Sequence, residues 1–209
     1  MANQAALPVR GSVACIVLAA GRSTRMGSDN KLLCEIAGKA MVRRVVETAL
    51  ASAARPVLVV TGHQASQVRA ALAGLAPVIV ANPDYATGLS SSLKAGIRAL
   101  PQDICGALVA LGDMPAVLPA HLDRMIEVFA AAHGQAIIVP VHQGQRGNPV
   151  LWPARYFPEI LQLDGDLGAR RLLATHAEQI REVALDAAAI LLDVDTPQAL
   201  AQLRERLTR

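Results

Sequence analysis

Aromatic residues are scarce in this chain of 209 residues, where two Phe, two Tyr and one Trp make up 2% of the sequence. Proteins that recognise single-stranded nucleic acid stack its bases on aromatic rings, and this composition argues against that function. The net charge is only +3, and Lys and Arg form no continuous block of the kind that a nucleic-acid-binding arm carries. We therefore expect no nucleic-acid partner.

Cysteines and long apolar runs are also few. Cys15, Cys34 and Cys105 lack the spacing of a metal site, and we interpret them as small hydrophobic residues in a reducing compartment. No apolar run approaches the ~20 residues that a membrane-spanning helix needs. The run from Val13 to Ala20 follows a single positive charge and leads into a loop rich in Gly and Arg, unlike a signal peptide. These absences predict a cytoplasmic protein without a membrane partner.

Ala, Val and Leu dominate an apolar fraction of 53%. Short apolar runs alternate with stretches of helical spacing, which is typical of a parallel sheet covered by helices on both faces. We expect strands at residues 13–18, 56–61, 78–81, 107–111, 136–140, 180–185 and 190–194, and helices at 41–53, 65–75, 90–100 and 118–133, with a last helix from about 197. The pattern predicts a single doubly wound, mostly parallel three-layer α/β domain over residues 13–209, after a loose tail at 1–12.

Two stretches depart from this rhythm. Residues 141–152 contain Gly144, Gly147 and Pro149 and are expected to form a hairpin or a long loop, followed by two short helical patterns. The helix at 90–100 begins with hydroxyl residues suited to capping its amino end.

The loop after the first expected strand is the most informative segment. In an open parallel sheet, ligands bind beyond the carboxyl ends of the strands, where this loop must lie. Gly21 and Gly27 allow the main chain to approach a ligand closely, and exposed amides there can bind phosphate oxygens. Arg25 and Lys31 add positive charge for a polyphosphate. Position 23 is Ser, which excludes the dinucleotide fingerprint, and no Gly-Lys-Ser/Thr is present for a Walker loop.

This loop resembles that of the MobA-like nucleoside-triphosphate transferases, in particular their molybdenum cofactor cytidylyltransferase branch. The signature of that family begins Leu-Ala-Ala-Gly-x-Ser-x-Arg-Met-Gly and continues to Lys-Leu-Leu, and each of these elements stands between Leu18 and Leu33. The likeness extends from about Val13 to Leu200. It implies a Rossmann-like nucleotidyltransferase fold and transfer of CMP from CTP to the phosphate of molybdopterin, with release of pyrophosphate. The resemblance also implies the following roles: nucleotide binding by Leu18, Ala19, Ala20 and Gly21, and catalysis by Arg25 and Lys31, which also bind the nucleotide.

A carboxylate follows the fourth expected strand in the segment Leu-Gly-Asp113-Met-Pro. Such an Asp can hold Mg²⁺ together with phosphate oxygens, or it can simply form a turn or cap a helix. The resemblance implies that Asp113 is a ligand of Mg²⁺. It also favours Asp195 as the second ligand, with Asp193 as the other choice, although Asp195-Thr-Pro can equally cap the last helix.

Three further segments match family motifs. The resemblance assigns Gly88, Ser90 and Ser91 to nucleoside recognition, whereas ordinary capping of a helix is the alternative. It assigns Asn148 and Arg170 to the acceptor. Many relatives carry His where Asn148 stands, so the role of that position is open, and Arg170 can equally be a surface residue of a helix.

The implied partners are CTP and a molybdopterin-type acceptor, with a molybdoenzyme or its maturation chaperone as protein partner. Guanylyl-transferring relatives carry Leu-Ala-Gly-Gly, so the methyl group of Ala20 is expected to narrow the base pocket and to favour a pyrimidine. The alternatives are a transferase for another nucleotide or another small phosphorylated acceptor, and a non-enzymatic carrier of molybdenum cofactor. A dehydrogenase is disfavoured by the missing fingerprint.

Overall fold

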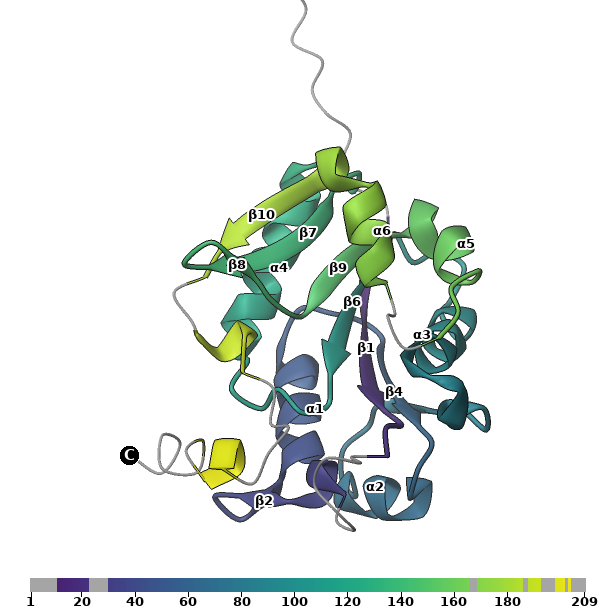
Figure 1. Cartoon of the computed structure of the whole chain (residues 1–209), viewed down its shortest axis with the longest axis vertical. Helices are drawn as coiled ribbons and strands as arrows, with labels where there is room; N and C mark the ends of the chain where they lie inside the picture. The colour runs from purple at the N-terminus through teal and green to yellow at the C-terminus, as the bar shows by residue number, and fades with distance from the viewer. Residues whose placement is uncertain are drawn as a thin grey trace, which may run out of the picture.

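The computed structural model of the chain describes residues 11–22, 30–165, 169–185, 188–192, 198–201 and 203. In this part of the chain the main sheet has the strand order β10-β7-β9-β6-β1-β4-β5, with β8 paired to β7 (Figure 1). The strands are β1 (Val13–Ala19), β4 (Val57–Thr61), β5 (Val78–Ala81), β6 (Gly106–Leu111), β7 (Ile137–His142), β8 (Gln145–Arg146), β9 (Val150–Pro153) and β10 (Ile180–Ala184). Neighbours are parallel except at β9, which lies antiparallel between β6 and β7, and at β8. The expected mostly parallel, single-domain α/β fold is confirmed.

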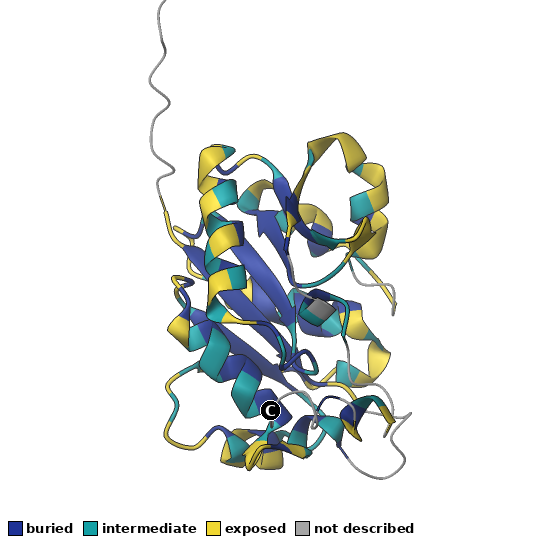
Figure 2. Cartoon of the chain, turned by 90° about the vertical axis from the view of Figure 1, so that its left-hand side faces the viewer, coloured by how far each residue is buried: buried dark blue, intermediate teal, exposed yellow. Residues whose placement is uncertain are grey.

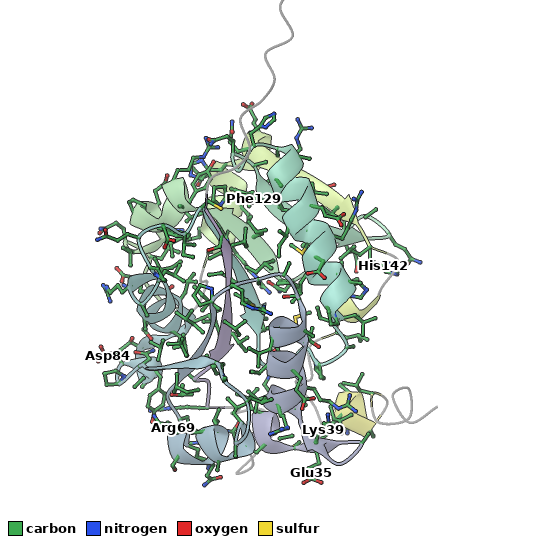
Figure 3. The ribbon with its side chains drawn as sticks, turned by 180° about the vertical axis from the view of Figure 1, so that it is seen from behind. Glu35, Lys39, Arg69, Asp84, Phe129 and His142 are labelled. Carbon is green, nitrogen blue, oxygen red and sulfur yellow. The ribbon has the colours of Figure 1, made fainter. Side chains whose placement is uncertain are left out.

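Helices cover both faces of this sheet. They are α1 (Met41–Ala51), α2 (Ala65–Ala71), α3 (Leu89–Arg98), α4 (Pro119–Ala131), α5 (Phe157–Ile160) and α6 (Arg170–Thr175). Short 3-10 turns are η2 (Lys31–Leu33), η3 (Tyr85–Thr87), η4 (Ala154–Tyr156), η5 (Ala177–Gln179) and η6 (Ala188–Ile190). Apolar residues of α1, α2 and α4 pack on one face, and those of α3, α5 and α6 on the other. Figure 3 shows the molecule from the α1 and α4 side.

The strand β1 shows why the apolar runs of the sequence become central strands. All seven of its residues are buried, and they alternate between the two faces: Cys15 and Val17 pack with α1 and α4, whereas Ile16 and Leu18 pack with α3. Full burial of such a side chain is worth roughly 1.5–3 kcal/mol, so a strand covered on both faces is apolar at every position. Figure 2 shows the buried strands between helices whose outward faces are exposed.

The helix α1 shows the complementary pattern. Val42, Val45, Val46 and Ala49 are its buried positions toward the sheet, at the spacing of one face of an α-helix. Its helical spacing was predicted from the sequence, and the helix ends two residues earlier than expected.

Some expectations about local structure were wrong. Ile190 was assigned to a strand, but it belongs to η6: its side chain is fully buried, and its carbonyl accepts a hydrogen bond from the amide of Asn148 at 3.0 Å rather than from a strand of the sheet. A hydroxyl cap was expected for α3, but the residue at its N-cap is Gly88 and no side chain caps it. Of the three cysteines only Cys15 is fully buried; Cys34 and Cys105 are partly exposed.

Other features were not foreseen. The strands β2 (Glu35–Ile36) and β3 (Lys39–Ala40) form a small hairpin whose turn has positive φ at Ala37 and Gly38. The expected hairpin or loop at 141–152 contains β8 and the start of β9. Residues 1–10 of the expected tail lie outside the described residues, while the carbonyl of Ser12 already accepts a hydrogen bond from the amide of Cys105 at 3.0 Å. No helix among the described residues has the length and apolar character to cross a membrane.

Candidate active site at the carboxyl edge of the sheet

The parallel strands of the sheet end at a common edge. Leu18 pairs with Leu111, Ala19 with Thr61, and Thr61 with Ala81. The loops after β1, β4, β5 and β6 therefore leave the sheet at the same level, which is where ligands bind in open α/β sheets. We call this region, formed by residues 20–22, 62–64, 82–88 and 112–114, the carboxyl edge. The strands β1 and β6 run downward toward this edge in Figure 1.

The ion pair between Lys31 and Asp113 joins two predicted site residues that are 82 positions apart in the sequence. Lys31 Nζ donates a hydrogen bond to Asp113 Oδ2 at 2.6 Å, and each side chain is only 14% exposed. Lys31 begins η2, whose N-cap residue Asn30 accepts a hydrogen bond from the amide of Leu32 at 3.1 Å. The cap at Asn30 fixes the start of η2, and the position of Lys31 opposite Asp113 follows from it.

Gly112 explains why Asp113 lies so close to β1 and η2. Its amide donates to the carbonyl of Leu18 at 3.0 Å. A Cβ atom on Gly112 would lie 3.0 Å from that carbonyl oxygen and 3.3 Å from Leu32 Cδ2. Because a side chain would push these segments apart, glycine at this position allows the carboxylate to meet Lys31.

The second oxygen of Asp113 suits a hard cation. Asp113 Oδ1 is buried and has no hydrogen-bond partner among the described residues. An unsatisfied buried acceptor costs roughly 1–3 kcal/mol, and Mg²⁺ commonly uses one or two carboxylates together with phosphate oxygens. The described ranges contain no group of three or more His, Cys, Asp or Glu side chains that could hold a metal by themselves. Asp195, predicted as the second ligand, and its alternative Asp193 lie outside the described residues, as does the predicted catalytic residue Arg25.

The predicted nucleotide-binding residues Leu18, Ala19 and Ala20 are almost completely buried, between 1% and 7% exposed. The carbonyl of Leu18 is bound by Gly112, and that of Ala20 accepts from the amide of His63 at 3.1 Å. Gly21 is exposed, and among the described residues no atom lies within 4 Å of the place that a Cβ would take on it.

A buried polar network organises the loop before α3. Asn82 is 5% exposed, and its Nδ2 donates to Ser91 Oγ at 2.9 Å and to Ser92 Oγ at 3.0 Å. Its Oδ1 accepts from the amide of Asp84 at 3.0 Å. The hydroxyl of Ser91 is also within hydrogen-bond distance of the carbonyls of Asp84 and Gly88. The predicted nucleoside residue Ser91 is thus part of the loop's internal structure.

The predicted nucleoside residue Ser90 is in a different situation. Its side chain is 1% exposed, and its Oγ has no hydrogen-bond partner among the described residues. Its amide donates to the carbonyl of Gly165 at 3.2 Å. Asp164 also pairs with Lys94 of α3 at 3.0 Å, so the loop that leads to the predicted acceptor residue Arg170 is tied to the helix that carries Ser90.

The two predicted acceptor residues lie in different surroundings. Asn148 precedes β9, whose residue Val150 pairs with Val109 of β6, and this places Asn148 near the carboxyl edge. Arg170 is exposed at the start of α6. The structure therefore brings Asn148 to the same edge as Asp113, while it shows no contact between Arg170 and the Lys31–Asp113 pair.

Sequence reasoning missed the structural role of Asn82. The available signal was a polar residue immediately after the apolar run Val78–Ala81, which a parallel sheet places at its carboxyl edge.

Residues 15–181, which include this edge and its ion pair, match the MobA-like NTP transferase domain. The chain belongs to this family. It is therefore a nucleotidyltransferase by family. It is 30% identical over 200 residues to the molybdenum cofactor cytidylyltransferase of Escherichia coli (strain K12), which covers 94% of this chain and 98% of that protein.

Solved structures support the same assignment. The Rv0371c homologue from Mycobacterium sp. strain JC1 has a TM-score of 0.85 and 27% identity, covering 94% of this chain and 97% of that one. Rv0371C from Mycobacterium tuberculosis H37Rv, in complex with manganese, has a TM-score of 0.80 and 29% identity, covering 93% and 98%. The expected family is confirmed by the domain match and the curated relative, and one of the similar solved structures is a complex with manganese.

Proposed function

We propose that this NTP transferase transfers CMP from CTP to the phosphate of molybdopterin and releases pyrophosphate. The observation that carries the proposal is the Lys31–Asp113 pair at the carboxyl edge, with Asp113 Oδ1 buried and available to a cation. The choice of CTP and molybdopterin is supported by the likeness to the Escherichia coli cytidylyltransferase over nearly the whole chain. The Leu-Ala-Ala-Gly segment before Arg22 agrees with that choice.

The reaction requires positioning and neutralisation of charge more than covalent chemistry from the protein. An oxygen of the acceptor phosphate attacks the α-phosphorus of CTP, the bond from that phosphorus to the oxygen that bridges it to the β-phosphorus breaks, and pyrophosphate leaves with that oxygen. Lys31 and Arg25 would stabilise the charge that grows on the reacting phosphates. Gly21, Gly88 and Ser90 would hold the nucleotide, and Asn148 and Arg170 the acceptor.

Asp113 and Asp195 would hold Mg²⁺. When bound, this ion supplies positive charge that neutralises the phosphates and orients them. Lys31 fixes one oxygen of Asp113 and so holds the carboxylate at the carboxyl edge.

A cytoplasmic place of action agrees with the three cysteines of the described chain, which are free thiols as expected in a reducing compartment. A molybdoenzyme or its maturation chaperone would receive the product. A non-enzymatic carrier of the cofactor is the second candidate, but a carrier has no need of a partly buried Lys–Asp pair at the nucleotide edge.

Pyrophosphate release by the purified protein tests the proposal. The protein is incubated with Mg²⁺, molybdopterin and each of the four NTPs in turn, with molybdopterin omitted or EDTA added as controls. We expect release with CTP that requires both molybdopterin and the metal. Turnover with CTP only when another phosphorylated acceptor replaces molybdopterin would change the acceptor, and no turnover with any NTP would favour the carrier.

A further inference from the structure

Tyr85 packs directly on a glycine of the neighbouring loop. A Cβ atom on Gly62 would lie 2.5 Å from Tyr85 Cβ and 2.6 Å from its Cγ, and 2.9 Å from Ala20 Cβ. The φ angle of Gly62 is outside the left-handed region, so close packing rather than backbone conformation requires glycine here. Gly62 thus allows the base of the Tyr85 side chain to lie against the end of β4.

The ring of Tyr85 holds residues from two other loops. The guanidinium carbon Cζ of Arg22 lies 5.6 Å from the ring centroid, within the range of a cation–π interaction. The ring of His63 lies 6.1 Å from that of Tyr85, and the amide of His63 donates to the carbonyl of Ala20. One aromatic side chain therefore connects the loops that follow β1, β4 and β5.

This arrangement leaves the guanidinium of Arg22 able to bind an anion. Arg22 is exposed, and within the described residues its guanidinium makes no ion pair. A cation–π contact uses the face of the guanidinium, whereas its five N–H donors lie in the plane and stay available for phosphate oxygens. Arg22 also follows Gly21, and no atom of the described residues lies within 4 Å of the position that a Cβ would take on that glycine.

We propose that Arg22 is an additional phosphate-binding residue of the nucleotide site, and that Tyr85 is its positioning residue. The ring restricts the guanidinium before the triphosphate arrives, so less rotamer freedom is lost on binding. Gly62 is required because it lets the ring reach this position. The inference rests on the proposed nucleotidyl transfer for its ligand, but it concerns polyphosphate binding and can be measured without turnover.

A second arginine–tyrosine pair elsewhere in the fold supplies a matched control. Arg155 Cζ lies 4.9 Å from the centroid of the Tyr156 ring. These residues follow β9, which is antiparallel to β6 and ends where Pro153 pairs with Gly106, at the edge opposite the carboxyl edge. Arg155→Met therefore removes the same charge from the same kind of contact at a distant place.

The experiment measures the affinity of inorganic tripolyphosphate and of cytidine, separately, in the presence of Mg²⁺ by titration calorimetry. We expect Arg22→Met to weaken tripolyphosphate binding about tenfold, the scale of a lost hydrogen bond to a charged group, while cytidine affinity is unchanged. Tyr85→Leu should weaken tripolyphosphate binding about 2- to 5-fold, as an exposed cation–π contact allows, and Tyr85→Phe by less than about twofold because the ring is kept. Arg155→Met should behave as the unmodified protein.

The double variant Arg22→Met/Tyr85→Leu decides whether Tyr85 acts through Arg22. If it does, the double variant binds tripolyphosphate as Arg22→Met does, because the effect of Tyr85 disappears with the arginine. Additive losses, or unchanged affinity in Arg22→Met, would overturn the proposal; so would equal losses in Arg155→Met.

Circular dichroism verifies folding, and should Tyr85→Leu fail to fold, Arg22→Met alone still decides the phosphate contact. Absence of pyrophosphate release from the unmodified protein would instead contradict the proposed function and leave this comparison intact.

Discussion

At the scale of single residues, Asp113 has two oxygens with different surroundings. Oδ2 is bound by Lys31, while Oδ1 is buried without a partner among the described residues. This asymmetry is expected of a carboxylate that is positioned by a lysine through one oxygen and coordinates a cation through the other. It makes Asp113 the most informative position to change.

Substitution of Asp113 tests the metal assignment. We expect Asp113→Ala and the isosteric Asp113→Asn to lower kcat/KM by at least about 10³-fold, because the charge that holds the cation is lost. Pyrophosphate release measures the effect, and circular dichroism verifies that the fold is kept. Asp103→Asn is the control, since Asp103 is an exposed residue at the opposite end of β6. Wild-type turnover of Asp113→Asn at ordinary Mg²⁺ concentrations would rule out a metal ligand here.

Lys31 gives a second prediction at this scale. Lys31→Ala removes a charge expected to stabilise the reacting phosphates, and kcat/KM should fall by at least ~10²-fold. Steady-state kinetics separate the two possible origins, because loss of a transition-state contact lowers kcat whereas loss of uniform binding raises KM. Lys39→Ala serves as the comparison, since Lys39 pairs with Glu47 of α1 at 2.8 Å and not with Asp113. A loss smaller than threefold in Lys31→Ala would mean that the lysine only holds the structure.

Ala20 concerns the choice of base. Ala20 is 2% exposed, and its methyl group faces Gly62. Its effect on the base pocket therefore comes from packing against the loop that contains Gly62 and not from direct contact with the base. We expect CTP to be preferred over GTP, and Ala20→Gly to reduce this preference by an amount equivalent to about 1–3 kcal/mol or less. Competition kinetics with the two nucleotides give the ratio. A wild-type preference for GTP, or an unchanged ratio in the variant, would refute the steric explanation while the transferase function stands.

At the scale of elements, the amino end of α3 depends on residues outside the helix. Gly88 occupies the N-cap position of α3, and no side chain makes a capping hydrogen bond there. The loop before the helix is organised by Asn82, which forms hydrogen bonds with the hydroxyls of Ser91 and Ser92 and with the amide of Asp84. The end of β5 thereby determines where α3 begins. This coupling places Gly88 and Ser90 relative to the rest of the carboxyl edge.

Asn82→Ala tests this coupling. The variant leaves two buried or partly buried hydroxyls and one amide without their present partner, and we expect the free energy of unfolding to fall by about 1–3 kcal/mol. The KM for the nucleotide should rise because Gly88 and Ser90 are displaced. Urea unfolding and steady-state kinetics measure the two effects. Ser92→Ala removes only one acceptor of the network, and its effect should be smaller; equal effects would mean that Asn82 has no special role.

At the scale of the whole molecule, the chemical reactivity of the Cys15 thiol shows whether the central strands of the sheet stay paired. It lies in β1 between β4 and β6, it is fully buried, and burial raises its pKa to about 12. Because the thiolate is the reactive form, Cys15 is both inaccessible and almost entirely protonated at neutral pH. Its reaction with an alkylating reagent requires that the central strands separate.

Pulsed alkylation along a urea gradient tests this expectation. We expect Cys15 to be modified only in the fraction of molecules that are unfolded by circular dichroism, whereas the partly exposed Cys34 and Cys105 react in native buffer. Mass spectrometry of peptides identifies each cysteine. Modification of Cys15 in native buffer at the rate of Cys105 would show that the sheet opens locally without global unfolding.

The sequence by itself determined most of the sheet and the location of the site. Runs such as Val13–Ala19 are apolar at every position because both faces of a central parallel strand are covered, and this leaves a local signal. Parallel strands end at one edge, so Lys31 and Asp113 could be assigned to the same edge from their position after strands. The motif around Leu18 to Leu33 identified the family for the same reason, since close approach to phosphates restricts the residue types in one short segment.

Only the tertiary structure decided which distant residues meet. Nothing in Val150–Pro153 reveals that this strand lies antiparallel between β6 and β7, because a local pattern carries no information about the partner of a strand. Ile190 is as buried as a strand residue, but its carbonyl is used by Asn148 instead of a strand of the sheet. The contact of Tyr85 with Gly62 and Arg22 arises in the same way: three loops that are remote in sequence converge because their strands end at one level, and packing then selects the neighbours.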